Sequence, residues 1–185
     1  MRRSIFFTFL MLFGLAGQAN AENGDQYWMA KAGLSWFDNI DGPDSMNALN
    51  VTYGYGLTKS LSAELDYQQS IGGGGYSKVS DAETEKGEYS YQLVSVGGAY
   101  RHVFYESLYF KGKLAFAFGD ETRTSSFLGS DVTNDATSDV TNLTGGLALG
   151  LLAGNVVGSS FTLELGYIKQ SSSLSSVMLG ANATF

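Results

Sequence analysis

The stretch Phe161-Thr-Leu-Glu164-Leu-Gly-Tyr167 has an apolar side chain at every second position, with threonine, glutamate and glycine between them. Successive side chains of a β-strand point to opposite faces, so this stretch predicts a strand with one apolar face and one polar face. Residues 61–67 read Leu-Ser-Ala-Glu-Leu-Asp-Tyr and repeat the pattern in the first half of the chain. In both stretches the glutamate is on the face opposite the large apolar residues. We therefore expect two strands of one sheet, each with a carboxylate on its polar face.

The same period of two extends over most of the chain. It predicts eight strands, over residues 27–36, 48–55, 61–68, 91–101, 108–118, 143–151, 161–168 and 175–185. The first six connections alternate in length, long at 37–47, 69–90 and 119–142 and short between them, and residues 169–174 connect the last pair. Short turns at one end and long loops at the other are typical of outer-membrane barrels. The sequence thus predicts an all-β fold, an eight-stranded antiparallel up-and-down transmembrane β-barrel. The strands of a secreted soluble β-barrel or sandwich that binds a ligand would also alternate apolar and polar residues. Such a fold is not expected to alternate long and short connections.

The first 21 residues have the pattern of a secretory signal peptide. Two arginines follow Met1, residues 5–15 are almost entirely apolar, and Ala19-Asn-Ala21 is a small-x-small cleavage signal. We expect residues 1–21 to be removed and residues 22–185 to form the barrel domain. The apolar run is too short to cross a bilayer as a helix.

Charge limits the classes of function. The formal net charge is −7, and loss of the two leader arginines makes the mature chain more negative still. Nucleic acid is therefore not an expected partner, because phosphate binding needs a basic surface. The chain has no Cys, which excludes disulfides, thiolate metal sites and Cys nucleophiles. The acidic excess belongs to the three long connections, including residues 38–44 and the residues Asp131, Asp135 and Asp139. Because neither group has the ligand spacing of an EF-hand, we interpret them as solvated acidic loops, and no metal or cofactor is expected.

The two faces of the strands differ in charge. Seven charged residues have the parity of the inner face, which defines an interior charge network of Lys31, Glu64, Asp66, Arg101, Lys111, Lys113 and Glu164. On the opposite face, aromatic residues gather toward both strand ends, as two girdles at the membrane interfaces would require. We expect the acidic and basic residues to pair inside the barrel, with inward glycines leaving room for long side chains. An eight-stranded barrel is just wide enough to be filled by side chains, so this network would plug it.

The repeated apolar-x-apolar-Glu-apolar-x-Tyr pattern resembles the OmpA-type outer-membrane β-barrel superfamily. The end of the chain resembles that superfamily's C-terminal assembly signal, which here would consist of Val177, Leu179, Ala181, Ala183 and Phe185. The chain stops at Phe185, so it is more similar to the small single-domain barrels than to members with a peptidoglycan-binding domain. The resemblance implies the outer membrane of a Gram-negative bacterium with both termini periplasmic. It also implies contact with lipid and lipopolysaccharide, recognition of Phe185 by the assembly machinery, and a monomer.

Function is expected to lie in the external loops. The leading hypothesis is a structural or surface-interaction protein, and the alternative within the same fold is a narrow channel for ions or small solutes. Some small outer-membrane barrels act on lipid with a His and a Ser near the outer leaflet, but the single histidine, His102, is predicted at a periplasmic turn. We therefore expect no enzymatic activity. The sequence does not identify a surface ligand.

Overall fold

Alternating sequence produces nine β-strands in the computed structural model, which describes residues 24–37, 45–80, 83–105, 107–127, 133–156, 159–171 and 174–184. The strands are β1 (Gln26–Phe37), β2 (Met46–Gly56), β3 (Leu61–Ser70), β4 (Gly74–Ser80), β5 (Glu83–Val103), β6 (Leu108–Phe127), β7 (Thr133–Val156), β8 (Ser159–Lys169) and β9 (Leu174–Thr184). All neighbouring strands are antiparallel, and in the described part of the chain no helix is long and apolar enough to cross a membrane.

Eight of the strands close into a barrel. Each pairs with its neighbour along the chain, β1 pairs with β9, and β3 pairs with β5 across the position of β4. The ring contains the eight segments predicted from periodicity, so the predicted fold class is confirmed. One end of the barrel, the turn end, holds the β2–β3, β5–β6 and β7–β8 connections together with the first residues of β1 and the last residues of β9. The opposite end is the loop end.

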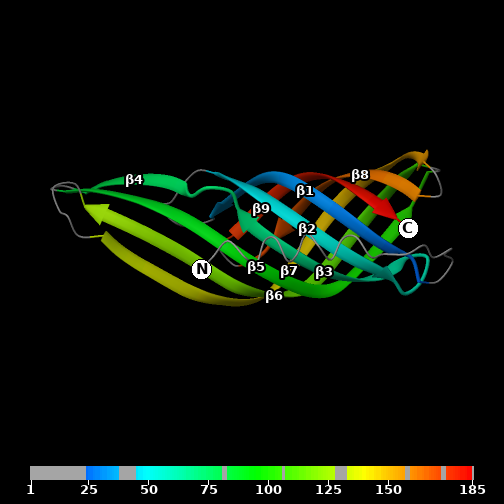
Figure 1. Ribbon diagram of the computed structural model, residues 1–185, viewed down its shortest axis with the longest axis horizontal. Coiled ribbons are helices and arrows are strands. Elements are labelled where there is room, and N and C mark those ends of the chain that lie inside the picture. Colours follow the sequence, from blue (N-terminus) through cyan, green and yellow to red (C-terminus); the bar gives the residue numbers. More distant parts are fainter. Residues whose placement is uncertain are drawn as a thin grey trace.

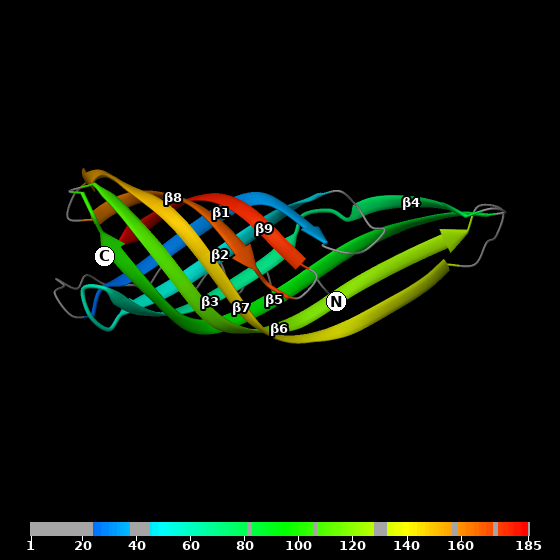
Figure 2. The same cartoon turned by 180° about the vertical axis from the view of Figure 1, so that it is seen from behind.

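The long connections predicted at 69–90 and 119–142 are mostly β-strand, and the prediction of loops there is wrong. β5, β6 and β7 contain 21, 20 and 24 residues, whereas a membrane-spanning strand needs about 9–11. β4 pairs with the first part of β5, and residues 120–127 of β6 pair with β5 on one side and β7 on the other. These parts form a projecting sheet, made of β4 and residues 83–90, 120–127 and 133–139, which extends past the barrel at the loop end (Figures 1 and 2).

The projecting sheet has no regular alternation of apolar and polar residues because most of its side chains are polar. Threonine and serine dominate residues 122–126 and 133–141, and β-branched threonine favours a strand without producing apolar alternation. At about 3.3 Å per residue, the seven or eight extra residues of each of the strands β5, β6 and β7 are ~25 Å long. The acidic residues Asp135 and Asp139 are exposed on strand β7 rather than in a loop.

The outer face of the barrel is apolar and exposed. Leu114, Leu143 and Phe116 are 66%, 65% and 57% exposed, and similar residues cover every strand of the ring. Two pairs of the aromatic residues predicted for the girdles lie close together, one near each end of the barrel. Trp28 contacts Tyr53 with ring centroids 4.8 Å apart near the turn end, and Trp36 lies 6.3 Å from Tyr167 near the loop end. This belt is the surface that a lipid bilayer would cover.

Candidate functional site

The lumen of the barrel holds the candidate site, and its centre is an ion-pair layer. Lys31 Nζ lies 2.6 Å from Glu164 Oε1. Lys111 Nζ lies between two carboxylates, 2.7 Å from Glu64 Oε1 and 3.4 Å from Glu164 Oε2. Lys113 Nζ lies 2.9 Å from Glu64 Oε2 and also pairs with Asp66. Three lysines and three carboxylates thus form one continuous, charge-balanced chain of contacts.

The cross-strand register of neighbouring strands positions the side chains of this layer. Gly54 pairs with Glu64, and Gly180 pairs with both Lys31 and Glu164, so small residues face the long charged ones. A Cβ atom at Gly180 would meet the Lys31 side chain. Glu64 and Glu164 are only 2% and 1% exposed. A charge buried to this degree is tolerated when it is paired and hydrogen-bonded, and here both conditions hold.

Hydroxyl groups complete the hydrogen bonding of the carboxylates. Thr52 Oγ1 donates to Asp66 Oδ1 at 2.6 Å, and Ser95 Oγ donates to Asp66 Oδ2 at 2.9 Å. The Tyr109 hydroxyl donates to Glu164 Oε2 at 3.1 Å, and the Tyr27 hydroxyl donates to Glu64. The layer is a hydrogen-bonded network that spans the lumen, because its members come from β1, β2, β3, β5, β6 and β8.

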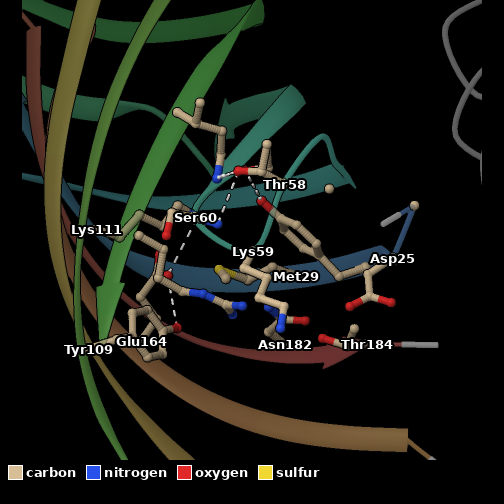
Figure 3. A pocket seen from close by; sticks show the side chains of 16 residues that line it. Asp25, Met29, Thr58, Lys59, Ser60, Tyr109, Lys111, Glu164, Asn182 and Thr184 are labelled. Carbon is tan, nitrogen blue, oxygen red and sulfur yellow. Dashed lines mark hydrogen bonds and ion pairs between the residues drawn. The ribbon is translucent and has the colours of Figure 1, made fainter. Parts of the chain in front are cut away.

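Arg101 is the member of the predicted network that lies outside this layer. Its guanidinium carbon is 5.5 Å from the centroid of the Tyr109 ring, and among the described residues it forms no ion pair. Arg101 is near the turn end of β5, where it pairs across the sheet with Lys111. It lines a cavity of about 370 Å³ on the turn side of the ion-pair layer, shown in Figure 3.

The lumen is filled again on the loop side. The Tyr91 hydroxyl lies 2.6 Å from Ser35 Oγ and accepts a hydrogen bond from Gln68 Nε2 at 2.8 Å. Next to this polar group is an apolar cluster, made of Phe37, Met46, Ala48, Tyr89, Tyr91, Leu93, Val140, Leu174 and Met178. A second cavity of about 20 Å³, large enough for a single water molecule, lies between the ion-pair layer and the loop-side polar group that contains Gln68.

Sequence reasoning missed this apolar cluster. Leu93 and Met178 are large apolar residues with the parity of the inner face, which was the available signal. Phe37 and Tyr89 fall in segments that the sequence predicts to be long connections. The cluster closes the loop end of the barrel as a small hydrophobic core.

The structure describes only some of the other residues that the sequence analysis singled out. Residues 38–44, Asp131, Phe185 and the leader 1–21 lie outside the described residues. Within the described ranges no group of three His, Cys, Asp or Glu side chains could hold a metal ion. Val177, Leu179 and Ala181 of the predicted assembly signal are exposed on the outer face of β9. His102 is exposed at the turn end of β5.

Comparison with known proteins places this geometry among solved structures. No family model and no curated protein matches the chain. The crystal structure of Ail, the attachment invasion locus protein of Yersinia pestis, covers 88% of this chain and 99% of its own at 18% identity and a TM-score of 0.58. Neisserial surface protein A covers 88% of this chain and 100% of its own at 13% identity and a TM-score of 0.57.

The outer membrane protein OprG of Pseudomonas aeruginosa is also similar, at 12% identity and a TM-score of 0.50, covering 90% of this chain and 98% of its own. The chain has the fold of the small outer-membrane barrels. The fold implied by the OmpA-type resemblance is therefore confirmed.

Proposed function

We propose that the protein is an integral barrel of the Gram-negative outer membrane, formed by residues 22–185 after removal of the leader 1–21. One observation carries this proposal: the polarity of the barrel is inverted relative to a soluble protein. Leucine, phenylalanine and valine are exposed around the outer face, while Glu64, Glu164 and Lys111 are buried inside. In water such an apolar belt would drive aggregation, whereas in a bilayer it is the favourable surface. The belt therefore argues against the secreted soluble alternative.

We further propose that the specific function is a surface interaction carried by the projecting sheet. The sheet extends well past the apolar belt at the loop end, so in the proposed orientation it stands outside the cell (Figure 1). β4 is an edge strand of the sheet, and residues 133–144 of β7 pair with β6 before β7 joins β8. Exposed strand edges present backbone donors and acceptors to a partner. The acidic Asp135 and Asp139 on one edge favour a partner with basic groups.

The contents of the lumen favour a structural role for the barrel over the alternative of a narrow channel. A solute would have to pass both the ion-pair layer and the apolar cluster at the loop end. Planar-bilayer conductance distinguishes these functions, and we expect no conductance above that of empty bilayers. We also expect no catalysis, because His102 lies at the turn end, away from the outer leaflet.

The orientation can be tested by cysteine labelling, because the chain has no native Cys. We expect Ala136→Cys on the projecting sheet to react with a membrane-impermeant maleimide in intact cells. The matched variant Lys59→Cys, in the β2–β3 turn, should react only after the outer membrane is permeabilised. Both sites are exposed in the folded protein, so a difference between them reports the side of the membrane. Labelling of Lys59→Cys in intact cells would contradict the periplasmic placement of the termini and turns.

A further inference from the structure

The cavity at the turn end of the barrel is not explained by a structural role. Its volume of about 370 Å³ is within the range of small-molecule sites, about 300–1,000 Å³. The ion-pair layer forms its floor, through Lys111 and Glu164. Figure 3 shows Thr58 and Ser60 on one side of the space and Asn182 and Thr184 on the other. The cavity thus has a closed floor and polar walls.

Among the described residues, the cavity walls carry more basic than acidic side chains, in a protein that is strongly acidic. The floor is neutral overall because Lys111 and Glu164 belong to the balanced ion-pair layer. Among the described residues of the walls, the charged side chains are Arg101, Lys59 and Asp25. Arg101 stacks on Tyr109 rather than on a carboxylate, which leaves its N–H groups available to a ligand. A guanidinium and an ammonium group in one cavity are suited to a phosphate oxyanion.

A buried hydrogen-bond acceptor without a partner also indicates a ligand in this cavity. Asn182 lines the cavity and is 5% exposed, and its Oδ1 atom has no hydrogen-bond partner among the described residues. A buried amide oxygen without a hydrogen-bond partner lowers the stability of the fold, because its lost hydration is not replaced. A ligand that brings a hydroxyl group would satisfy it. A ligand suited to the cavity therefore has a hydrogen-bond donor as well as an anionic group.

Two glycines keep the cavity open. A Cβ atom at Gly54 would meet the ring of Tyr27, and a Cβ atom at Gly150 would meet the ring of Tyr109. Because these positions lack side chains, both tyrosine rings lie flat against the barrel wall. Larger residues there would push the rings into the space that the cavity occupies. The wall is thus shaped so that the cavity persists beside bulky aromatic groups.

We propose that this cavity binds a small phosphate ester with free hydroxyl groups. The phosphate would contact Arg101 with support from Lys59, and a ligand hydroxyl would donate to Asn182 Oδ1. The same phosphoglycerol chemistry occurs in free sn-glycerol 3-phosphate and in the headgroup of phosphatidylglycerol, and either source could enter from the turn end. The site lies on the opposite side of the ion-pair layer from the projecting sheet, so it is separate from the proposed surface function.

Methionine methyl NMR provides a direct test. Met29 lines the cavity, whereas Met46 and Met178 belong to the apolar cluster at the loop end and serve as internal controls. The full protein is extracted in octyl glucoside, which contains no phosphate, and titrated with sn-glycerol 3-phosphate. We expect a saturable shift of the Met29 signal with little change at Met46 and Met178. Glycerol, which lacks the anion, should produce no saturable shift.

Two variants assign the shift to the named residues. Arg101→Gln should weaken binding at least tenfold, while Arg123→Gln, which alters an arginine of the projecting sheet, should leave the affinity unchanged. Asn182→Asp has nearly the same shape but places a negative charge against the phosphate, and it should also weaken binding. Heat-modifiable gel migration of each variant confirms that the barrel is folded.

Further arms distinguish the source of the ligand and define failure. In nanodiscs without added solute, a Met29 shift that appears with phosphatidylglycerol and not with phosphatidylcholine identifies the lipid headgroup as the ligand. A shift only with the free ester identifies a solute. The proposal is overturned if Met29 does not respond in either arm, if Arg101→Gln binds as tightly as the parent, or if sodium sulfate at equal ionic strength reproduces the effect.

Discussion

Replacing Lys111 with methionine tests the ion-pair layer most sharply. Lys111 Nζ lies 2.7 Å from Glu64 and 3.4 Å from Glu164, and its side chain is 8% exposed. Methionine has a similar length and no charge, so the variant leaves three carboxylates with only Lys31 and Lys113. Removing one partner from a buried charge pair costs about 3–5 kcal/mol. We therefore expect the unfolding equilibrium constant to rise by a factor between roughly 10² and 10⁴, because about 1.4 kcal/mol corresponds to a factor of ten.

The measurement is urea unfolding in lipid vesicles, followed by the fluorescence of the two tryptophans, Trp28 and Trp36. The control is Lys86→Met, which removes an exposed lysine from the projecting sheet and should change stability by less than about 0.5 kcal/mol. The double variant Glu64→Gln/Lys111→Met is the more selective test. It leaves Lys31 paired with Glu164 and Lys113 paired with Asp66, so charge is again balanced.

We expect the double variant to be more stable than Lys111→Met alone, although it carries an additional substitution. This non-additivity would show that a stranded carboxylate, rather than lost packing, destabilises the single variant. The reasoning is refuted if Lys111→Met unfolds at the same urea concentration as Lys86→Met. It is also refuted if the costs of the two single substitutions simply add in the double variant.

Other substitutions test the outer face, the packing and the loop end by the same unfolding assay. Leu114→Arg should cost about 2–4 kcal/mol because it places a charge on the outer belt, whereas Ala136→Arg on the projecting sheet should cost little. Gly97→Ala should cost about 1–3 kcal/mol, since its Cβ would meet backbone atoms of β6, including the Leu114 carbonyl. The adjacent Gly98→Ala is the control, because its nearest neighbour is 3.8 Å away. Glu121 lies beyond the apolar belt on β6, and burial raises the pKa of its carboxyl group. The neutral carboxyl is tolerated at low pH, and this stability is lost as the pH rises through the raised pKa and the buried group becomes charged. Glu121→Gln should therefore be more stable than the parent at pH 7.5 and equal to it near pH 4. An equal difference at both pH values would contradict this explanation.

The sequence predicted the ring of the barrel because each ring strand has one face toward an apolar environment. Residues 161–167 illustrate this, since lipid on one side and a crowded lumen on the other impose a strict period of two. The projecting sheet could not be found in this way. Most side chains of residues 120–127 and 133–139 are polar, so these strands show no hydrophobic alternation in the sequence.

The alternation of faces along each strand predicted that the charged residues lie in the lumen. It did not predict where along the barrel axis each one lies. Arg101 and Lys111 are cross-strand partners with the same inward parity, and only their contacts distinguish an arginine of the cavity from a lysine of the ion-pair layer. The cavity itself depends on the space that Gly54 and Gly150 leave for two tyrosine rings. Such space is a property of the closed barrel, in which residues distant along the chain face one another.

Heat-modifiable electrophoresis of the protein extracted from the outer-membrane fraction tests the central claim, that a lipid-facing barrel surrounds a filled lumen. An intact barrel retains its compact form in SDS at room temperature and unfolds on boiling. We expect the unboiled and boiled samples to migrate as two separate bands. Recovery of the protein in the soluble fraction, with identical migration before and after boiling, would contradict the account.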